Sequence, residues 1–567
     1  MKTFDYSLVK DPQYFKDRRM DAHSDHTYYR DGEEAQEKAT SFRYDLNGIW
    51  KFHYARNYGS AIPGFEKADY CCKDWDDIRV PAHIQMEGYD APQYANVQYP
   101  WEGHEDIHPG EIPEHFNPVA SYVKYFEVPE EMQGKRLFIS FQGAESGIAL
   151  WLNGQFVGYS EDSFTPSEFE LTEYVKEGEN KLAAQVFKWT ASSWCEDQDF
   201  YRFSGIYRDV YLYTVPEVHV YDLQIRAIPD ETLSTAALEI GTDTWGKGTV
   251  KITLSKDGET VIEDKKALDG EEIYSWKVED PVLWSAEDPQ LYDLVLEVYN
   301  EAGELQEVVP QKVGFRRFEM KDGIMTLNGK RIVFKGVNRH EFSSVSGRHV
   351  SEEELRKDLK IMKQNNINAI RTSHYPNAPW ATQMYDKYGF YVMDEADLES
   401  HGCTTLYGSK SEHVDMGEVQ YEESYGYLMR DPSYENAVVD RIQHLVHRDK
   451  NCSSVFSWSM GNESAYGPNL EKAAAWIKSY DPDRVLNYEN SIWQQTNTDY
   501  VNDVHDLDVF SRMYAPVEFI DEFCSKEGKK PFIEVEYCHA MGNGPGDLEA
   551  YFERLYKSVS YTHLRAH

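Results

Sequence analysis

The segment INAIRTSHYPNAPWATQMYDKYGFYVMDEAD, residues 367–397, contains one complete unit of the pattern that decides the fold. Two apolar runs, 367–376 and 390–397, flank a stretch with helical periodicity, 380–389. A strand, a helix and a second strand in this order form a βαβ unit, which joins two parallel strands. Both predicted strands end in polar groups, which are costly to bury and therefore indicate a site.

The same alternation extends over residues 318–557. Further strands are predicted at 331–340, 454–463, 484–490, 508–514 and 531–540, and further helices at 351–366, 434–450, 470–480 and 547–557. All seven predicted strands end in polar residues. An open parallel sheet needs such groups at one switch point only, whereas the strand ends of a barrel converge on one mouth. The pattern therefore favours a (β/α)8 TIM barrel over a doubly wound sheet.

The residues before the barrel have a different period. From 41 to 216 short alternating runs are separated by turn residues such as Asn153-Gly154, which is typical of a β-sandwich. A second, shorter β stretch at 217–317 is long enough for an immunoglobulin-like sandwich. Residues 1–40 are an N-terminal extension. The sequence thus predicts a multidomain protein with two β-sandwich modules and a barrel.

Composition excludes several functional classes. The chain has 567 residues, with 58 Lys plus Arg against 98 Asp plus Glu, giving a formal net charge of −40. Such a surface repels phosphate backbones and anionic lipid, so neither nucleic acid nor a membrane is an expected partner. No apolar run has the length of a membrane span, and the seven cysteines are scattered without a C-x-x-C pair. These features predict a cytoplasmic protein with free thiols.

Two glutamates at the ends of different strands are the strongest candidates for a catalytic pair. Glu463 follows the fourth predicted strand and Glu536 the seventh. Two inward carboxylates about 5–5.5 Å apart can cleave a glycosidic bond with retention, one as proton donor and the other as nucleophile. Asn462 suits a sugar hydroxyl, and Arg371 can keep a nucleophilic carboxylate ionised. Glu534, two residues before Glu536 on the same strand, is expected to share its face and to point into the barrel.

Several motifs carry a resemblance to a known family. They are NAIRTSHYPN (368–377), DEADLESHG (394–402), DKNCSSVFSWSMGNES (449–464) and EYCHAMGN (536–543), preceded in order by NVQYP (96–100), DQDFYRFSGIYRDV (197–210) and GVNRHE (336–341). Together they resemble the β-galactosidases of glycoside hydrolase family 2, the lactose-operon type. The resemblance covers the chain to about Lys557. It implies a jelly-roll domain, an immunoglobulin-like domain and a catalytic TIM barrel.

The resemblance also implies roles for individual residues. It makes Glu463 the general acid/base and Glu536 the nucleophile in the retaining hydrolysis of terminal β-galactosides, such as lactose. It implies a galactose subsite lined by His340, His374, Asn462, Tyr514 and His539, with Asn96 and Asp199 contributed by jelly-roll loops. Glu399, His401 and Glu463 resemble a magnesium site, and Asp199 resembles a sodium ligand. The family resemblance further suggests a homo-oligomer for a full-length protein.

The sequence departs from the family pattern at three places. Cys452 replaces a larger polar residue, which we expect to affect packing, and Phe342 replaces a common histidine near the mouth. Residues 558–567, SVSYTHLRAH, do not resemble the family. We therefore expect a barrel that lacks its last strand, with unpaired edges on the first and seventh strands, ending in an unrelated tail. On this basis we expect the chain to be a truncated reading of a longer gene.

Three alternatives to a β-galactosidase remain open on the sequence. A β-glucuronidase is the nearest related activity. A catalytically incompetent carbohydrate-binding fragment would follow from an incomplete barrel. A metal-dependent hydrolase could use the histidines of the predicted mouth, namely His340, His374, His401 and His539.

Overall fold

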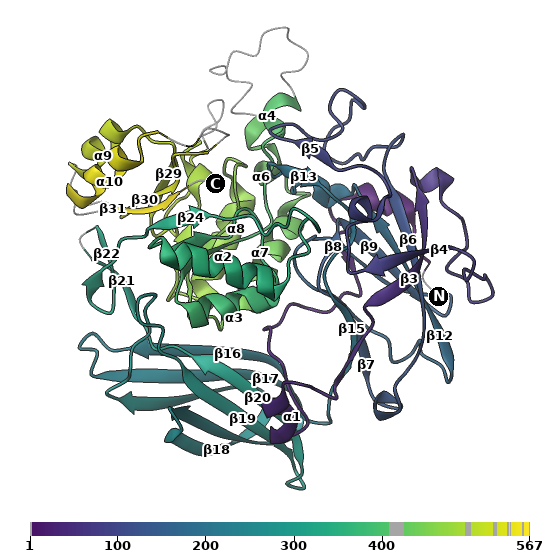
Figure 1. Cartoon of the computed structure of the whole chain (residues 1–567), viewed down its shortest axis with the longest axis horizontal. Coiled ribbons are helices and arrows are strands. Elements are labelled where there is room, and N and C mark those ends of the chain that lie inside the picture. Colours follow the sequence, from purple (N-terminus) through teal and green to yellow (C-terminus); the bar gives the residue numbers. More distant parts are fainter. Residues whose placement is uncertain are drawn as a thin grey trace.

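A computed structural model gives the fold of residues 3–321, 323–406, 424–493, 500–525, 530–540, 544, 546–557 and 561–565. Three domains are visible in Figure 1, with the barrel beside the N-terminal sandwich and above the second β domain. The predicted order of jelly-roll, immunoglobulin-like domain and TIM barrel is confirmed. Among the described residues, no helix is both long and apolar enough to cross a membrane.

The N-terminal domain is a sandwich of two antiparallel sheets with an apolar core between them. In order, the larger sheet contains β1 (Lys16–Asp17), β10 (Gln155–Ser160), β9 (Gly147–Leu152), β12 (Glu179–Phe187), β6 (Val119–Glu127), β3 (Gly48–Ala55) and β4 (Asp76–Val80). The smaller sheet contains β11 (Ser167–Glu170), β7 (Leu137–Phe141), β15 (Val210–Thr214) and β2 (Arg43–Asp45). Because β1 pairs with β10, part of the extension 1–40 belongs to this sandwich.

Two short strand pairs and one helix complete this region. The pairs are β13 (Phe200–Arg202) with β5 (Gln93–Ala95), and β14 (Gly205–Ile206) with β8 (Ala144–Glu145). The helix α1 (Gly32–Glu37) begins after Asp31, whose side chain accepts two backbone N–H groups of its first turn. The pair β13–β5 lies on the side of the N-terminal domain that is next to the barrel in Figure 1.

The second domain, which is the immunoglobulin-like one, consists of antiparallel strands that form one continuous set of pairs and share one apolar core. Its order is β16 (His219–Pro229), β17 (Thr235–Lys256), β19 (Tyr292–Asn300) and β20 (Leu305–Val313), and β18 (Glu259–Glu279) pairs with β17. A three-stranded sheet, β21 (Phe318–Lys321), β22 (Ile324–Leu327) and β23 (Lys330–Arg331), follows before the barrel. Its residues Met325 and Leu327 pack into the same apolar cluster as the barrel strands.

Eight parallel strands form the barrel sheet. In order they are β28 (Val485–Asn487), β27 (Val455–Ser459), β26 (Tyr391–Glu395), β25 (Ala369–Arg371), β24 (Gly336–Asn338), β31 (Tyr561–Arg565), β30 (Phe532–Glu536) and β29 (Phe510–Met513). Among the described residues of this region, the helices are α2 (Glu352–Gln364), α3 (Pro379–Tyr388), α4 (Cys403–Leu406), α6 (Tyr427–Arg430), α7 (Glu435–Asp449), α8 (Pro468–Tyr480), α9 (Val517–Cys524) and α10 (Leu548–Lys557).

The expectation of a missing last strand is wrong for the described residues. Tyr561–Arg565, inside the tail that the sequence motifs led us to expect as unrelated, forms β31 and pairs in parallel with both β30 and β24. Backbone hydrogen bonds depend little on side-chain identity, so this short segment can fill the eighth position. The first and seventh strands are therefore paired, and the ends of the sheet are β28 and β29.

Candidate active site

The first predicted carboxylate, Glu536, lies at the end of β30 and is almost fully buried. Its Oε1 accepts a hydrogen bond from Arg371 Nη1 at 3.0 Å, and its Oε2 accepts one from the Tyr514 hydroxyl at 2.5 Å. The His374 Nε2 lies 3.6 Å from the same Oε1. A guanidinium and a phenol therefore hold both carboxylate oxygens in place, as the positioning of a nucleophile requires.

The neighbouring Glu534 does not share this environment, so the expectation of a common face is wrong. Ile533 and Val535 pack in the barrel interior, whereas Phe532 packs in the outer layer with Ala515 and Tyr551. Glu534 lies on that outer side, where its Oε1 accepts the Ala515 N–H at 2.7 Å. A register shift against β29 between Glu534 and Glu536 breaks the alternation. This β-bulge turns Glu536 into the mouth.

Arg371 is the centre of the polar network at the barrel mouth. Besides Glu536, its guanidinium donates to Glu395 Oε2 at 2.7 Å and to Asn462 Oδ1 at 2.9 Å. Burial opposes the charge of Arg371, but Glu395 and Glu536 outweigh it and raise the pKa above its usual range. In the sequence, Glu395 is one of the polar groups at the end of the predicted strand 390–397, with no role assigned to it. The structure makes it a second carboxylate partner of Arg371, whose buried charge would be costly without such pairing.

Two histidines of the predicted sugar site, His340 and His374, lie close together at the mouth. His374 Nδ1 is 2.7 Å from Glu395 Oε1, which orients the ring toward Glu536. The ring of His340 is 5.9 Å from that of His374 and edge-on to it, and its Nδ1 is 3.3 Å from the Tyr375 hydroxyl. The structure thus brings His340, His374, Asn462, Arg371 and Tyr514 together around Glu536.

The second carboxylate, Glu463, belongs to a separate group of ligand-type side chains. Its Oε2 is 2.7 Å from His401 Nδ1, and Glu399, His401 and Glu463 each offer one atom within 4.8 Å of the others. Asn462 Nδ2 donates to Glu399 Oε2 at 2.9 Å. Asn462 therefore bridges Arg371, on the Glu536 side, to the group that contains Glu463.

The charges of Glu463 and Glu536 both affect the pKa of Glu489. Burial first, and then the charge of Glu463 with a contribution from Glu536, raises the pKa of Glu489 to about 8. The pKa of Glu399 is raised well above its usual range by burial and by the charge of Glu463. Glu463 and Glu536 thus contribute negative charge to the same buried carboxyl groups, and such an electronegative region favours a cation.

Jelly-roll residues reach the same mouth through β13 and β5. The Tyr94 hydroxyl donates to Asp199 Oδ1. It also interacts with the side chain of Asn96, which is exposed just after β5. Burial opposes the charge of His401, but the contact with Glu463, followed by the charges of Asp197 and Asp199, outweighs it and raises the pKa of His401. The predicted jelly-roll residues Asn96 and Asp199 therefore lie beside the ligand group of the barrel, although Tyr94 was not anticipated.

The segment 195–198 of the jelly-roll domain fastens the loop that carries Glu399 and His401. Glu399 N donates to Cys195 O at 2.7 Å, Asp197 N donates to Glu399 O at 3.1 Å, and Gly402 N donates to Asp197 Oδ2 at 2.7 Å. No motif of the sequence suggested this role for Asp197.

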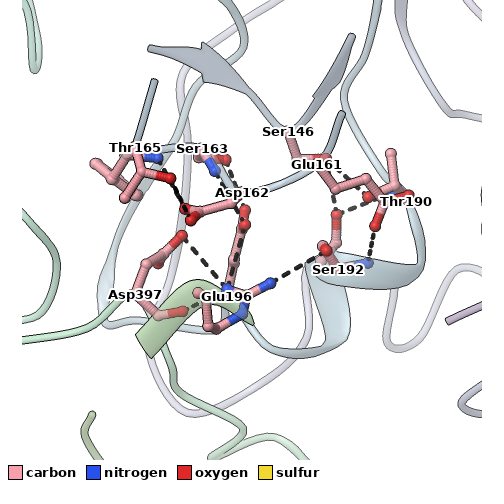
Figure 2. A network of polar contacts seen from close by, with 12 residues as sticks. Ser146, Glu161, Asp162, Ser163, Thr165, Thr190, Ser192, Glu196 and Asp397 are labelled. Atoms are coloured by element: carbon pink, nitrogen blue, oxygen red, sulfur yellow. Dashed lines mark hydrogen bonds and ion pairs between the residues drawn. The ribbon is translucent and has the colours of Figure 1, made fainter. Parts of the chain in front are cut away.

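Behind that loop lies a buried network of polar contacts between the two domains. Figure 2 shows Asp397 of the barrel close to Glu196 and Asp162 of the jelly-roll domain. Arg441 of α7 lies 3.5 Å from the carboxylates of both Glu196 and Asp397 and donates to Ser192 Oγ at 3.1 Å. Three carboxylate atoms of this cluster lie close enough for a metal ion, but the Arg441 guanidinium already supplies the cation.

One predicted residue is not joined to the others by these contacts. His539 lies half-buried three residues beyond Glu536, and residues 541–543 of its motif are outside the described residues. Its place in the sugar site stays a prediction. Cys452 is half-buried before β27, as its expected role in packing requires.

A parallel barrel whose mouth holds two carboxylates from different strands, with a β-sandwich contributing to that mouth, is the architecture of a multidomain glycoside hydrolase. Family models agree. Residues 318–563 match the TIM barrel domain of the family 2 glycosyl hydrolases, residues 43–216 its sugar binding domain, and residues 218–316 a further family 2 model. The chain belongs to family 2 of the glycosyl hydrolases.

Individual relatives fit this assignment. A beta-galactosidase of Halalkalibacterium halodurans is 47% identical over 99% of the chain and 54% of its own length. A beta-galactosidase large subunit of Leuconostoc lactis is 38% identical over 98% of the chain and 88% of its own length. The chain thus spans about half the length of several curated relatives. Among solved structures, a Bifidobacterium dentium beta-glucuronidase has a TM-score of 0.70 at 20% identity, covering 93% of this chain and 91% of that chain, a likeness of fold.

Proposed function

We propose that this protein is a retaining β-galactosidase that hydrolyses terminal non-reducing β-D-galactose residues of lactose and related β-galactosides. The observation that carries the proposal is the pair Glu536 and Glu463 at one mouth, with Glu536 held by Arg371 and Tyr514. The β-galactosidase relatives, 36–47% identical over nearly the whole chain, support galactose as the sugar.

The mechanism assigns different work to the two glutamates. Glu536 attacks the anomeric carbon and forms a glycosyl-enzyme, while Glu463 gives its proton to the leaving oxygen. Glu463 then removes a proton from the water that releases the sugar. Arg371 stabilises the charge of Glu536 before attack, and the Tyr514 hydroxyl orients it.

Magnesium is part of the proposal, and the residues fit it. Glu399, His401 and Glu463 supply two carboxylates and one imidazole within 4.8 Å, in a mouth crowded with negative charge. Such a cation would lower the repulsion between these carboxylates and hold Glu463 in place. We expect calorimetry to detect magnesium binding that Glu399→Gln weakens at least tenfold, and chelation to reduce turnover. Unchanged binding in that variant would contradict the site.

Sodium at Asp199, a homo-oligomeric state and a cytoplasmic location stay predictions. The charge of Asp199 acts on His401, and Asp199 Oδ1 accepts a hydrogen bond from the Tyr94 hydroxyl. These contacts are compatible with a cation subsite next to the magnesium ligands.

The activity is tested by comparing two substrates. We expect the chain to hydrolyse nitrophenyl β-D-galactoside and to leave nitrophenyl β-D-glucuronide essentially uncleaved, and proton NMR should detect β-galactose as the first product because two displacements retain the configuration. A preference for the glucuronide would refute the sugar assignment, and α-galactose as the first product would refute the mechanism. Galactose binding without any hydrolysis would favour a non-catalytic fragment.

A further inference from the structure

Three aromatic side chains are exposed side by side near the barrel mouth. Tyr94, Tyr201 and Phe342 are 53%, 44% and 46% exposed. The rings of Tyr94 and Tyr201 are 5.6 Å apart and edge-to-face, and the rings of Tyr201 and Phe342 are 6.5 Å apart and nearly parallel. Contiguous exposed apolar groups commonly mark a binding surface. We call these three residues the aromatic platform.

The aromatic platform is continuous with the active site on two sides. The hydroxyl of Tyr94 bonds to Asp199, which lies near His401. Phe342 lies two residues beyond His340, whose ring is next to that of His374. The platform thus borders the sugar site both where the jelly-roll domain and where the barrel contribute to it.

The backbone that carries the platform is well anchored. Tyr94 and Tyr201 are directly opposite each other in the pair β5–β13, and Arg348 Nη1 donates to Tyr201 O at 2.8 Å. The loop after Phe342 closes on itself through two hydrogen bonds between Ser343 and Gly347, of 2.7 and 3.1 Å. Rigid aromatic rings that are exposed before binding lose little conformational entropy when a ligand stacks on them.

We propose that the aromatic platform binds the aglycone of the substrate, the group that leaves when the glycosidic bond is cut. An aryl ring, or the apolar face of a second sugar ring, stacks on Tyr201 and Phe342 while galactose occupies the polar pocket around Glu536. This inference rests on the proposed function, because it takes the galactose position as given. The inference adds a second binding surface of the protein, the aromatic platform, which would determine which galactosides the enzyme prefers.

Isothermal titration calorimetry with two non-hydrolysable ligands tests the platform independently of turnover. Phenylethyl 1-thio-β-D-galactoside carries an aromatic aglycone, and methyl 1-thio-β-D-galactoside carries none. We expect the unchanged chain to bind the aryl ligand about tenfold more tightly. In Tyr201→Ala and Phe342→Ala this preference should fall toward one, with the affinity for the methyl ligand unchanged. Phe342→Tyr, which keeps a ring, should retain the preference.

A control and two further readouts make the result decisive. Tyr44→Ala removes a tyrosine of similar exposure, 43%, from the distant strand β2 and should leave the preference unaltered. If the unchanged chain binds both ligands equally, the platform proposal is wrong and the proposed function stands. If it binds neither, both fail. Sedimentation velocity showing that Tyr201→Ala dissociates an oligomer would identify the platform as an interface between copies and overturn the proposal.

Discussion

At the scale of single residues, the two neighbouring glutamates of β30 have different tasks. Glu536 is held by Arg371 and Tyr514 in the mouth, whereas Glu534 supports the chain behind it by accepting the Ala515 N–H. Since Ala515 follows Tyr514 directly, Glu534 also helps to place the phenol that contacts Glu536. One residue acts on substrate and the other acts on the scaffold.

Replacing each glutamate should separate these tasks. We expect Glu536→Gln to lower kcat about a thousandfold or more, because an amide is a poor nucleophile, with little change in the melting temperature. Glu534→Gln, which keeps an acceptor for Ala515 N–H, should retain most of the turnover. Glu534→Leu should lose about 1–3 kcal/mol of stability by orphaning that buried donor. Steady-state kinetics and thermal unfolding measure both effects, and a Glu534→Gln enzyme as inactive as Glu536→Gln would contradict the assignment.

A histidine of the N-terminal extension should make stability depend on pH. Burial opposes the charge of His23, but Glu168 at 2.6 Å outweighs it and raises the pKa of His23 to about 9, above the ordinary 6.5. A raised pKa in the folded state means that the ion pair stabilises fully below pH 6.5 and loses its contribution as pH rises through 9.

His23→Gln tests this sign. Allowing for the partly exposed ring, we expect the variant to lose about 2 kcal/mol at pH 6 and almost nothing at pH 10, measured by urea unfolding. His505→Gln, in a ring that is 90% exposed, serves as the control and should change little at either pH. A loss of stability that grows with pH would contradict the assigned direction.

At the scale of elements, the pairing of β31 determines whether β24 and β30 have unpaired edges. It lies between β30 and β24, so both strands have a parallel neighbour. A strand in this place satisfies backbone groups of two others, and unpaired edges promote association between chains.

Removing residues 558–567 should therefore expose β24 and β30. We expect the shortened chain to melt at a lower temperature and to aggregate, with turnover reduced because Glu536 lies on β30. Differential scanning calorimetry and light scattering measure these effects. A chain that lacks these residues and remains equally stable and monodisperse would show that β31 contributes nothing to the barrel.

At the scale of the whole molecule, Arg441 joins two domains. It reaches Glu196 and Ser192 of the jelly-roll domain and Asp397 of the barrel, all of them buried. Asp397 is two residues from Glu399, so the same contact supports the loop of the proposed magnesium site.

Arg441→Met should leave the buried carboxylates without their cation. We expect a loss of about 3–5 kcal/mol, visible as a lower melting temperature, together with weaker magnesium binding in calorimetry. Arg554→Met removes an exposed partner of Asp521 and should change stability by less than about 1 kcal/mol. An Arg441→Met protein as stable as the parent would show that the network does not hold the domains together.

The sequence by itself determined the three-domain order, the parallel barrel and the position of Glu463 and Glu536 at the ends of barrel strands, because periodicity, strand-end polarity and local motifs are properties of short segments. Tertiary structure alone decided the rest. Contacts between residues far apart in the chain decide three features of the site. They are the bulge that separates Glu534 from Glu536, the ion pair of Glu395 with Arg371, and the hydrogen bonds by which Asp197 anchors the Glu399 loop. The pairing of β31 likewise depends on backbone groups, which carry no sequence signal of their own.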